Sequence, residues 1–236
     1  MPHLNRWLDD QVGGGMWYSD ARQAKSLYQV GIVLAALEVY ELTKEQPYLD
    51  RALACYAWME EHLLRPDGLY WCDYSAAGPV GAERPDDIHE AGSVTFLAGN
   101  MGMGVAHARL HRITNEEEYR KTAVRTADAI LAGLTDGKSV LLDDRDAWRN
   151  GTFAGEWARE VLPLPGIAQQ HQDLLRGTAR AIYVRARTPD GHYGGSWNGP
   201  PDGPGSRWSS AGSRPQQIMT SANAANMIVG AAAIDR

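Results

Sequence analysis

The stretch at residues 31–52, GIVLAALEVYELTKEQPYLDRA, decides the fold that we predict, because its pattern recurs at residues 102–123, GMGVAHARLHRITNEEEYRKTA. In both copies apolar residues follow a helical spacing, a polar turn interrupts them, and a second helical segment follows. Each copy therefore predicts an αα-hairpin, two antiparallel helices joined by a tight turn. The matching residues are Gly31 and Gly102, Ala35 and Ala106, Val39 and Leu110, Leu42 and Ile113, Thr43 and Thr114, Tyr48 and Tyr119, and Ala52 and Ala123.

The rest of the chain also favours helices. We expect them over residues 21–43, from the next turn to about 64, over 94–114, 118–134, 152–161 and 166–188, and from Pro215 onward. No segment alternates apolar and polar residues in the way that a half-buried strand does. The sequence therefore predicts an all-α protein with one domain over residues 1–236.

The spacing of the hairpins indicates how they are arranged. The repeat is longer than the units of tetratricopeptide or ankyrin arrays, and long connections separate the hairpins. This is typical of an αα-hairpin toroid, in which inner and outer helices alternate and the long connections gather on one rim. Roughly four hairpins fit into the chain, so we expect an incomplete (α/α)6 barrel.

The long connections contain the residues that we expect to bind a ligand. The loop GGGMWYSD at 13–20 carries Trp17 and Tyr18, and the loop YGGSWNGPPD at 193–202 carries Trp197 and Asn198. An indole held on a rigid Gly/Pro loop can stack on a sugar ring, while neighbouring polar groups bind the sugar hydroxyls. The alternative is that Trp197 closes the helical core.

Composition narrows the classes of function. Ten Tyr and eight Trp against two Phe favour surfaces that are both flat and polar, as a carbohydrate site requires. A net charge of −6 without a basic block argues against a nucleic-acid partner. No apolar run approaches the roughly 18 residues that cross a bilayer, so we expect no membrane partner. The start, MPHLNRWLDD, lacks the pattern of a signal peptide, which predicts a cytoplasmic protein, or a secreted one if the natural start lies upstream.

Cysteine and histidine usage predicts neither a disulfide framework nor a metal site. Cys55 and Cys72 are too few for either, so we expect buried or free thiols. His107 and His111 have a spacing on a helix that could bind a metal, but no third ligand lies near them in the sequence. We predict no metal and no cofactor.

The loops and the repeat together resemble glycoside hydrolase family 76, the α-1,6-mannanases, within the (α/α)6 toroid glycosidases. The resemblance keeps its order over nearly the whole chain. It is carried by the glycine run with aromatics at 13–18, Y-x-L-T before Y-L-x-x-A within 36–52, the aromatic segment at 67–73, Phe153-Ala154-Gly155 with Arg159, G-G-x-W-x-G-P-P at 194–201 and T-S-x-x-x-A at 220–225. The resemblance implies that rim residues bind sugar, the aromatic rings by stacking and the Asp and Asn side chains through hydroxyl groups. These residues are Trp17, Tyr18, Trp71, Asp73, Asn100, Trp197 and Asn198.

The sequence departs from the family's pattern in two places. The family's W-T-Y-N-Q-G segment is replaced by residues 97–102, LAGNMG, which keep only Asn100 and Gly102. In the family, two adjacent aspartates well upstream of the glycine run act as nucleophile and acid/base. Because this chain begins about a dozen residues before Gly13, we expect the pair to be missing.

Three pairs of adjacent aspartates remain as candidates: Asp9 and Asp10, Asp86 and Asp87, and Asp143 and Asp144. Retaining glycoside hydrolysis requires two carboxyl groups about 5–5.5 Å apart, one ionised and one protonated. Each pair is more typical of a solvated turn than of a catalytic site. Asp9 and Asp10 are the catalytic candidates because Gln11 follows them, although their short distance to the glycine run better matches an acidic turn that precedes this run.

We therefore predict a carbohydrate-active protein that resembles an endo-α-1,6-mannanase and binds a mannan-like oligosaccharide or polysaccharide. One alternative is a non-catalytic glycan-binding or degenerate scaffold protein. Another is an N-acylglucosamine 2-epimerase-like sugar isomerase, since Lys25-x-x-Tyr28 before a hairpin resembles that family too; such enzymes need paired histidines, which the rim sequence does not offer. The open edge of the ring predicts an exposed apolar patch or a homodimer that covers it.

Overall fold

The computed structural model describes residues 15–17, 25–79, 95–136, 140–141, 151–189, 191–193, 197 and 218–234. It confirms the predicted helical fold. The α-helices in this part of the chain are α2 (Val30–Thr43), α3 (Gln46–His62), α4 (Leu97–Thr114), α5 (Glu117–Gly133), α7 (Ala154–Glu156), α8 (Gln169–Arg185) and α9 (Ile218–Ala233). A 3₁₀ turn, η2 (Leu27–Gln29), precedes α2, and a π-helix, η3 (Trp157–Val161), continues α7. None of the described helices is both long and apolar enough to cross a bilayer.

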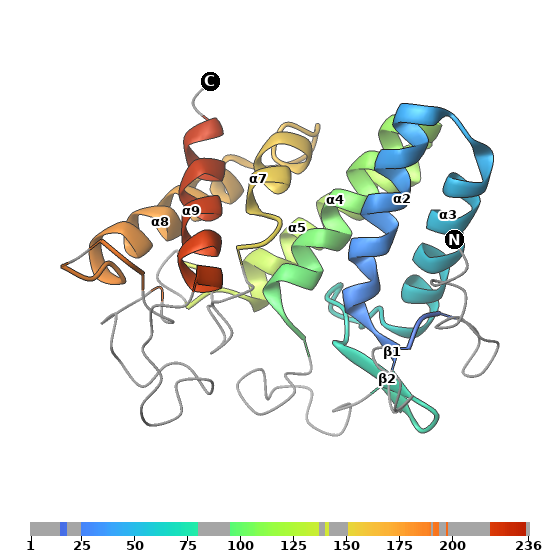
Figure 1. Ribbon diagram of the computed structural model, residues 1–236, viewed down its shortest axis with the longest axis horizontal. Coiled ribbons are helices and arrows are strands. Elements are labelled where there is room, and N and C mark those ends of the chain that lie inside the picture. The colour runs from blue at the N-terminus through green and yellow to red at the C-terminus, as the bar shows by residue number, and fades with distance from the viewer. Residues whose placement is uncertain are drawn as a thin grey trace.

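The helices form an arc of paired elements. Within the two repeat copies α2 packs on α3 and α4 on α5, and α8 packs on α9. A second set of contacts links these pairs into the arc: α2 contacts α4, α4 contacts η3, and α9 contacts both α7 and η3. Figure 1 shows α2 beside α4 above the strands, with α7 between α4 and α9. This is the arrangement of inner helices in a toroid, and it sets one rim apart from the other.

Both repeat copies end their first helix in the same way. The residue after the helix, Lys44 in one copy and Asn115 in the other, has a φ of 59° and lies in the left-handed region. In each copy the last threonine, Thr43 or Thr114, donates its hydroxyl to the carbonyl four residues back at 2.9 Å. The same hydroxyl accepts the amide two residues ahead at 3.2 Å. Because the two turns are the same, the repeat can be detected in the sequence.

The first turn holds a residue poorly suited to its conformation, which yields a test. Asparagine adopts the left-handed region more readily than lysine does. We expect Lys44→Asn to raise the free energy of unfolding by about 0.5–1 kcal/mol, measured by urea denaturation. The reciprocal change Asn115→Lys should lower it by a similar amount. A loss of stability in Lys44→Asn would contradict this account.

A small antiparallel sheet corrects the prediction that the chain contains no strand. It consists of β1 (Lys25–Ser26), β2 (Asp73–Ser75) and β3 (Gly78–Pro79), with Ser26 opposite Asp73 and Tyr74 opposite Pro79. Strands of two or three residues are too short to show an alternating pattern, so their residues carry no periodic signal. Because β1 occupies Lys25–Ser26, the first long helix, α2, begins at Val30 and not at the expected residue 21.

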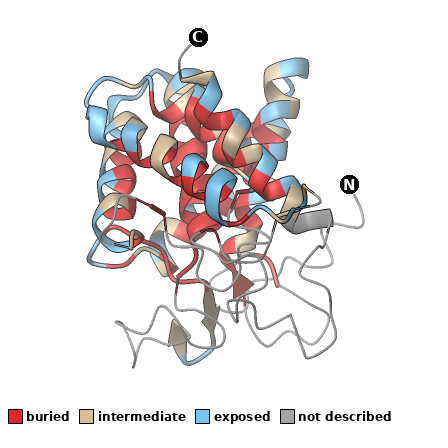
Figure 2. Ribbon diagram, turned by 90° about the vertical axis from the view of Figure 1, so that its left-hand side faces the viewer, coloured by how far each residue is buried: buried red, intermediate tan, exposed pale blue. Residues whose placement is uncertain are grey.

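The core is centred on α4, which the other inner elements enclose. Every residue from Leu97 to Leu110 is buried, and Figure 2 shows buried residues throughout the middle of the helical layer. Small residues allow this close approach, since a Cβ atom added at Gly104 would lie 2.3 Å from the ring of Trp157. Cys55 and Cys72 are buried free thiols, as predicted.

Candidate functional site

The sheet brings together two of the predicted sugar-binding residues from distant loops. Trp17 forms an antiparallel bridge with Lys25, and Lys25 pairs with Tyr74 in β2, next to Asp73. The ammonium group of Lys25 lies 4.8 Å from the centre of the Trp17 ring, a cation–π contact. We call the cluster of Trp17, Lys25, Ser26 and residues 71–75 the sheet rim. It lies beside the N-terminal end of α2, where the long connections were predicted to gather.

The structure explains why the last residue of the glycine run, Gly15, must be a glycine. Gly15 has a φ of 73°, and a Cβ atom there would lie 2.5 Å from the ring of Trp58, which the chain crosses at this point. The next residue is fixed by the buried side chain of Gln29, whose Oε1 accepts the Met16 amide at 3.1 Å while its Nε2 donates to the Ser26 carbonyl at 3.0 Å. Trp17 therefore reaches the sheet on a constrained backbone.

Asp73 is the acid of the sheet rim, and its side chain is only partly buried. Burial raises the pKa of the Asp73 carboxyl above its ordinary value, while hydrogen bonds from Ser26 and Cys72 oppose this shift. The strand pairing places Asp73 opposite Ser26, and the Ser26 hydroxyl lies 3.2 Å from the Cys72 carbonyl. The Asp73 carboxylate can bind a sugar hydroxyl as acceptor, and its protonated form can donate.

The indoles predicted to stack on sugar are buried in this structure. Trp17, Trp71 and Trp197 expose 6%, 9% and 0% of their surface. The guanidinium of Arg65 covers Trp71 at 4.6 Å from the ring centre. Trp197 comes from the connection between α8 and α9, and its burial agrees with the alternative that it closes the core. Sugar stacking by these rings stays a prediction, and it requires a movement that uncovers them.

Asn100 is also fully buried, in the first turn of α4. Its Oδ1 accepts the Tyr70 amide at 2.9 Å, and its Nδ2 donates to Thr95 Oγ1 and to the Phe96 carbonyl, both at 2.8 Å. The amide group thus binds the protein itself. The remaining predicted site residues, Asp9, Asp10, Tyr18 and Asn198, lie outside the described residues, as do the pairs at 86–87 and 143–144.

A buried polar network next to the sheet rim was not predicted from the sequence. The Tyr70 hydroxyl donates to Glu60 and lies 3.1 Å from His107 Nε2. Burial lowers the pKa of His107 to about 3, so the imidazole is neutral at physiological pH. Burial also raises the pKa of Glu60, against the hydrogen bond from Tyr70 and the charge of Arg125. The sequence places His107 near His111 as a possible metal pair, whereas in the structure His107 contacts Tyr70, whose amide binds Asn100 two helical turns away on the same face of α4.

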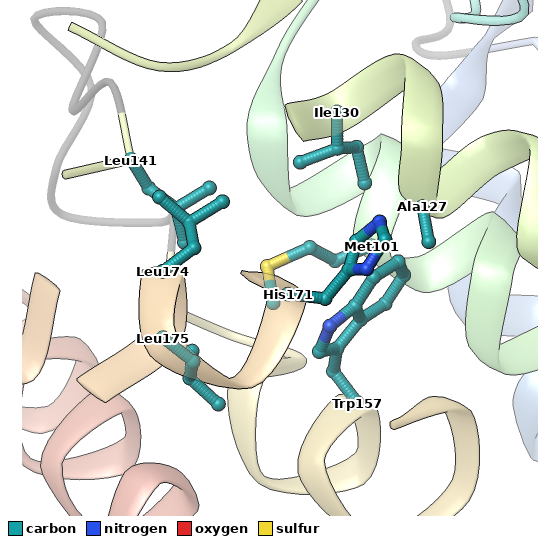
Figure 3. A pocket seen from close by; sticks show the side chains of 8 residues that line it. All are labelled: Met101, Ala127, Ile130, Leu141, Trp157, His171, Leu174 and Leu175. Atoms are coloured by element: carbon teal, nitrogen blue, oxygen red, sulfur yellow. The ribbon is translucent and has the colours of Figure 1, made fainter. Parts of the chain in front are cut away.

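The described residues offer no metal site, and one small apolar cavity lies among the helices. No group of three or more His, Cys, Asp or Glu among these residues is placed to hold a metal ion. One cavity lies between α4, α5, α8 and η3 (Figure 3), with a volume of about 10 Å³. That is room for about one water molecule. Its lining is apolar except for His171, which contacts Asp128 at 3.1 Å. The residues lining it are Met101, Ala127, Ile130, Leu141, Trp157, His171, Leu174 and Leu175.

Comparison with known proteins gives a family and a fold. The sequence model described as Glycosyl hydrolase family 76 matches residues 3–233. An inactive variant of the α-1,6-mannanase GH76A of Salegentibacter sp. HEL1_6, in complex with α-1,6-mannotriose, is similar in structure with a TM-score of 0.77 and 20% identity. The alignment covers 100% of this chain and 67% of that chain. No protein with a curated description matches the sequence.

Two further structures show the same fold at greater distance. A family 76 glycoside hydrolase from a bovine Bacteroides thetaiotaomicron strain has a TM-score of 0.74 and 18% identity, covering 99% of this chain and 49% of its own. Dfg5 from Chaetomium thermophilum, in complex with glucosamine, has a TM-score of 0.69 and 13% identity, covering 98% of this chain and 57% of its own. The present chain therefore spans between about half and two thirds of the length of the structures that it resembles.

Proposed function

Because the chain belongs to glycosyl hydrolase family 76, we propose that it binds α-1,6-linked mannan oligosaccharides at the sheet rim and takes part in their hydrolysis. The substrate class is suggested by the α-1,6-mannotriose bound to the Salegentibacter mannanase. The observation that carries the proposal is the meeting of Trp17 and Asp73 in one sheet. These residues come from connections far apart in the sequence, and each lies in a segment that resembles the family.

The chemistry of the sheet rim fits a neutral, hydroxyl-rich ligand. Asp73 and Tyr74 are half-buried, so part of each side chain faces solvent. Tyr74 packs edge-on against Trp58 and His62, with ring centres 6.0 and 5.0 Å away. A hydrogen-bonding acid beside a firmly packed aromatic ring is the usual composition of a sugar site. The catalytic pair is a separate matter, for which Asp9 and Asp10 stay the sequence candidates.

Calorimetry with α-1,6-mannotriose tests the binding proposal. We expect wild type to bind and Asp73→Asn to bind roughly tenfold more weakly, because a charge-assisted hydrogen bond to a hydroxyl becomes a neutral one. Asp50→Asn is the matched control, since Asp50 is exposed on α3 and its side chain accepts a hydrogen bond from the nearby Gln46 at 2.8 Å. Equal affinity in Asp73→Asn and wild type would remove Asp73 from the site, and an absence of binding by wild type would refute the proposal.

An assay of mannotriose cleavage separates hydrolysis from binding alone. Turnover that disappears in the double variant Asp9→Asn/Asp10→Asn would assign the catalytic pair to these residues. Binding without turnover would instead support the alternative of a non-catalytic glycan-binding protein. Both outcomes keep the sheet rim as the sugar site.

We also propose that a second copy of the chain covers the open face of α2. Leu42 is 77% exposed there, and Gly31 and Ala35 on the same helix are exposed as well. Their repeat counterparts in α4, Gly102 and Ala106, are buried against neighbouring inner elements. The α2 face therefore has the composition of a helix-packing surface. A dimeric mass in light scattering that becomes monomeric in Leu42→Arg is the expected result, and a monomeric wild type would refute this proposal.

A further inference from the structure

Tyr70 is held at both of its ends by one face of α4. Its backbone amide donates to Asn100, and its hydroxyl lies against His107. Asn100 and His107 are two turns apart, which places them on the same side of the helix and about 10 Å apart along its axis. The tyrosine side chain spans this interval, and it is fully buried. The arrangement is a two-point attachment of the loop after α3 to α4.

The attachment at the backbone end uses the whole Asn100 amide group. One oxygen accepts the Tyr70 amide, and both donor positions are taken up by Thr95 Oγ1 and the Phe96 carbonyl, at distances between 2.8 and 2.9 Å. A buried amide that satisfies three separate partners fixes their relative positions, because each lost bond leaves a buried polar group without its partner. Asn100 thus ties the Tyr70 backbone to the residues that lead into α4.

The attachment at the hydroxyl end has a defined proton arrangement. Since the Tyr70 hydroxyl donates to Glu60, its oxygen accepts a hydrogen bond from Nε2 of His107. Nδ1 of His107 has no hydrogen-bond partner within the described part of the chain, which agrees with a neutral imidazole protonated at Nε2. Glu60 belongs to the last turn of α3, so the bond also joins α3 to α4.

The residues directly after Tyr70 form the sheet rim. The Trp71 amide donates to the Leu63 carbonyl at 2.7 Å, and the Leu27 amide donates to the Cys72 carbonyl at 2.8 Å. Asp73 then pairs with Ser26 in the sheet. Residues 70–73 are therefore held by a continuous series of hydrogen bonds that starts at Asn100. The Leu27 amide bonds to the far end of this segment, so its hydrogen exchange can show whether the segment has moved.

We propose that Asn100 and His107 are positioning residues that set the sheet rim for sugar binding by fixing Tyr70. This inference rests on the proposed function for its sugar-binding part only. It gives Asn100 a role through the backbone of Tyr70 in place of direct contact with the sugar. It also predicts that loss of the Asn100 hydrogen bonds loosens Leu27 and Asp73, although the Asn100 side chain bonds neither residue.

The test compares Asn100→Leu with Asn100→Asp and with Glu160→Gln in the full chain. Leucine removes every hydrogen bond of the amide, whereas aspartate keeps an oxygen for the Tyr70 amide. Glu160→Gln is a stability control, because Glu160 binds Arg109 and Arg112, which lie outside the sheet rim. Amide hydrogen exchange at Tyr70 and Leu27 is measured together with the dissociation constant for α-1,6-mannotriose, at a temperature where all variants are folded. Tyr70→Phe, which removes only the hydroxyl, serves if Asn100→Leu does not fold.

In Asn100→Leu we expect exchange at Tyr70 and at Leu27 to be about tenfold faster or more, and mannotriose to bind about tenfold more weakly. Asn100→Asp should recover part of both effects, and Glu160→Gln should change neither by more than about twofold. Unchanged exchange at Leu27 in Asn100→Leu, or in Tyr70→Phe where that variant replaces it, would overturn the positioning role. Unchanged affinity would overturn its link to the sugar. If wild type binds no mannotriose, the proposed function fails, and the exchange data still decide the positioning role.

Discussion

Arg109→Met is expected to lower the free energy of unfolding by about 3–5 kcal/mol, the range observed when one partner of a buried ion pair is removed. Arg109 lies on α4 and exposes 11% of its side chain, and its partner Glu160 on η3 exposes 13%. Two nitrogens of the guanidinium donate to Glu160, with distances of 2.8 to 3.2 Å. Methionine fills similar volume but leaves the carboxylate of Glu160 partly unpaired.

The same guanidinium reaches a third inner element. Its Nη1 donates to Glu38 at 3.2 Å and to the Leu34 carbonyl at 3.4 Å, both on α2. Arg109 therefore joins α2, α4 and η3, on the side of the helical layer that is remote from the sheet rim. Removing it should weaken the packing of all three elements, and the loss should lie toward the lower end of that range because Arg112 still binds Glu160 at 3.0 Å.

Urea denaturation measures this loss, and Arg112→Met is the matched control. The Arg112 side chain is 50% exposed, so we expect its replacement to cost about 1 kcal/mol or less. A loss in Arg109→Met no larger than in the control would show that the buried pair does not stabilise the arc.

Lowering the pH should weaken the stabilisation that the pair of Arg109 and Glu160 provides. Burial alone would raise the pKa of Glu160, but hydrogen bonds and charge from Arg109 and then Arg112 hold it below its ordinary value. A carboxyl with a lowered folded pKa stabilises the fold above its unfolded pKa of about 4.3, and this contribution disappears as pH falls through the folded value. The difference in stability between wild type and Glu160→Gln should therefore be largest near neutral pH and should shrink below about pH 4. A difference that grows on acidification would contradict this sign.

The sequence predicted the helix pairs well because their signals are local. Apolar spacing marks the helices, and Thr43 with Lys44 and Thr114 with Asn115 form the same turn in both copies. The ionic network of Arg109 was not predictable, since Glu38, Arg109 and Glu160 meet only after three helices pack together. The strands were missed because two or three residues carry no periodicity.

The candidate site was predictable in its location and less so in its details. The loops with Trp17 and Asp73 meet in the sheet, as expected from connections that gather on one rim. What sequence reasoning could not show is which way each ring faces, because burial depends on distant partners. Trp71 lies under Arg65, and the Asn100 amide is fully used by Tyr70 and the start of α4. Residue type alone suggested a sugar contact where the structure shows an internal bond.

Gly102→Val is expected to lower the free energy of unfolding by about 3 kcal/mol, near the upper part of the usual range for overpacking a core. A Cβ atom at this position would lie 2.9 Å from the ring of Phe153 and 3.0 Å from Val30, so the inner helices must separate. The position is buried in the middle of the arc, where α4 has neighbours on both sides.

The repeat supplies a control at the equivalent position of the first copy. Gly31 matches Gly102 in the sequence, but a Cβ atom there meets nothing within 4 Å because α2 lies at the edge of the arc. We expect Gly31→Val to change the stability of the monomer by no more than about 0.5 kcal/mol, since valine suits a helix slightly better than glycine does and no contact within one chain opposes it. Urea denaturation of both variants measures the contrast. Equal losses would mean that an unseen neighbour covers α2 in solution, so the comparison should be repeated at low protein concentration, where a dimer dissociates and the Gly31 effect alone should diminish.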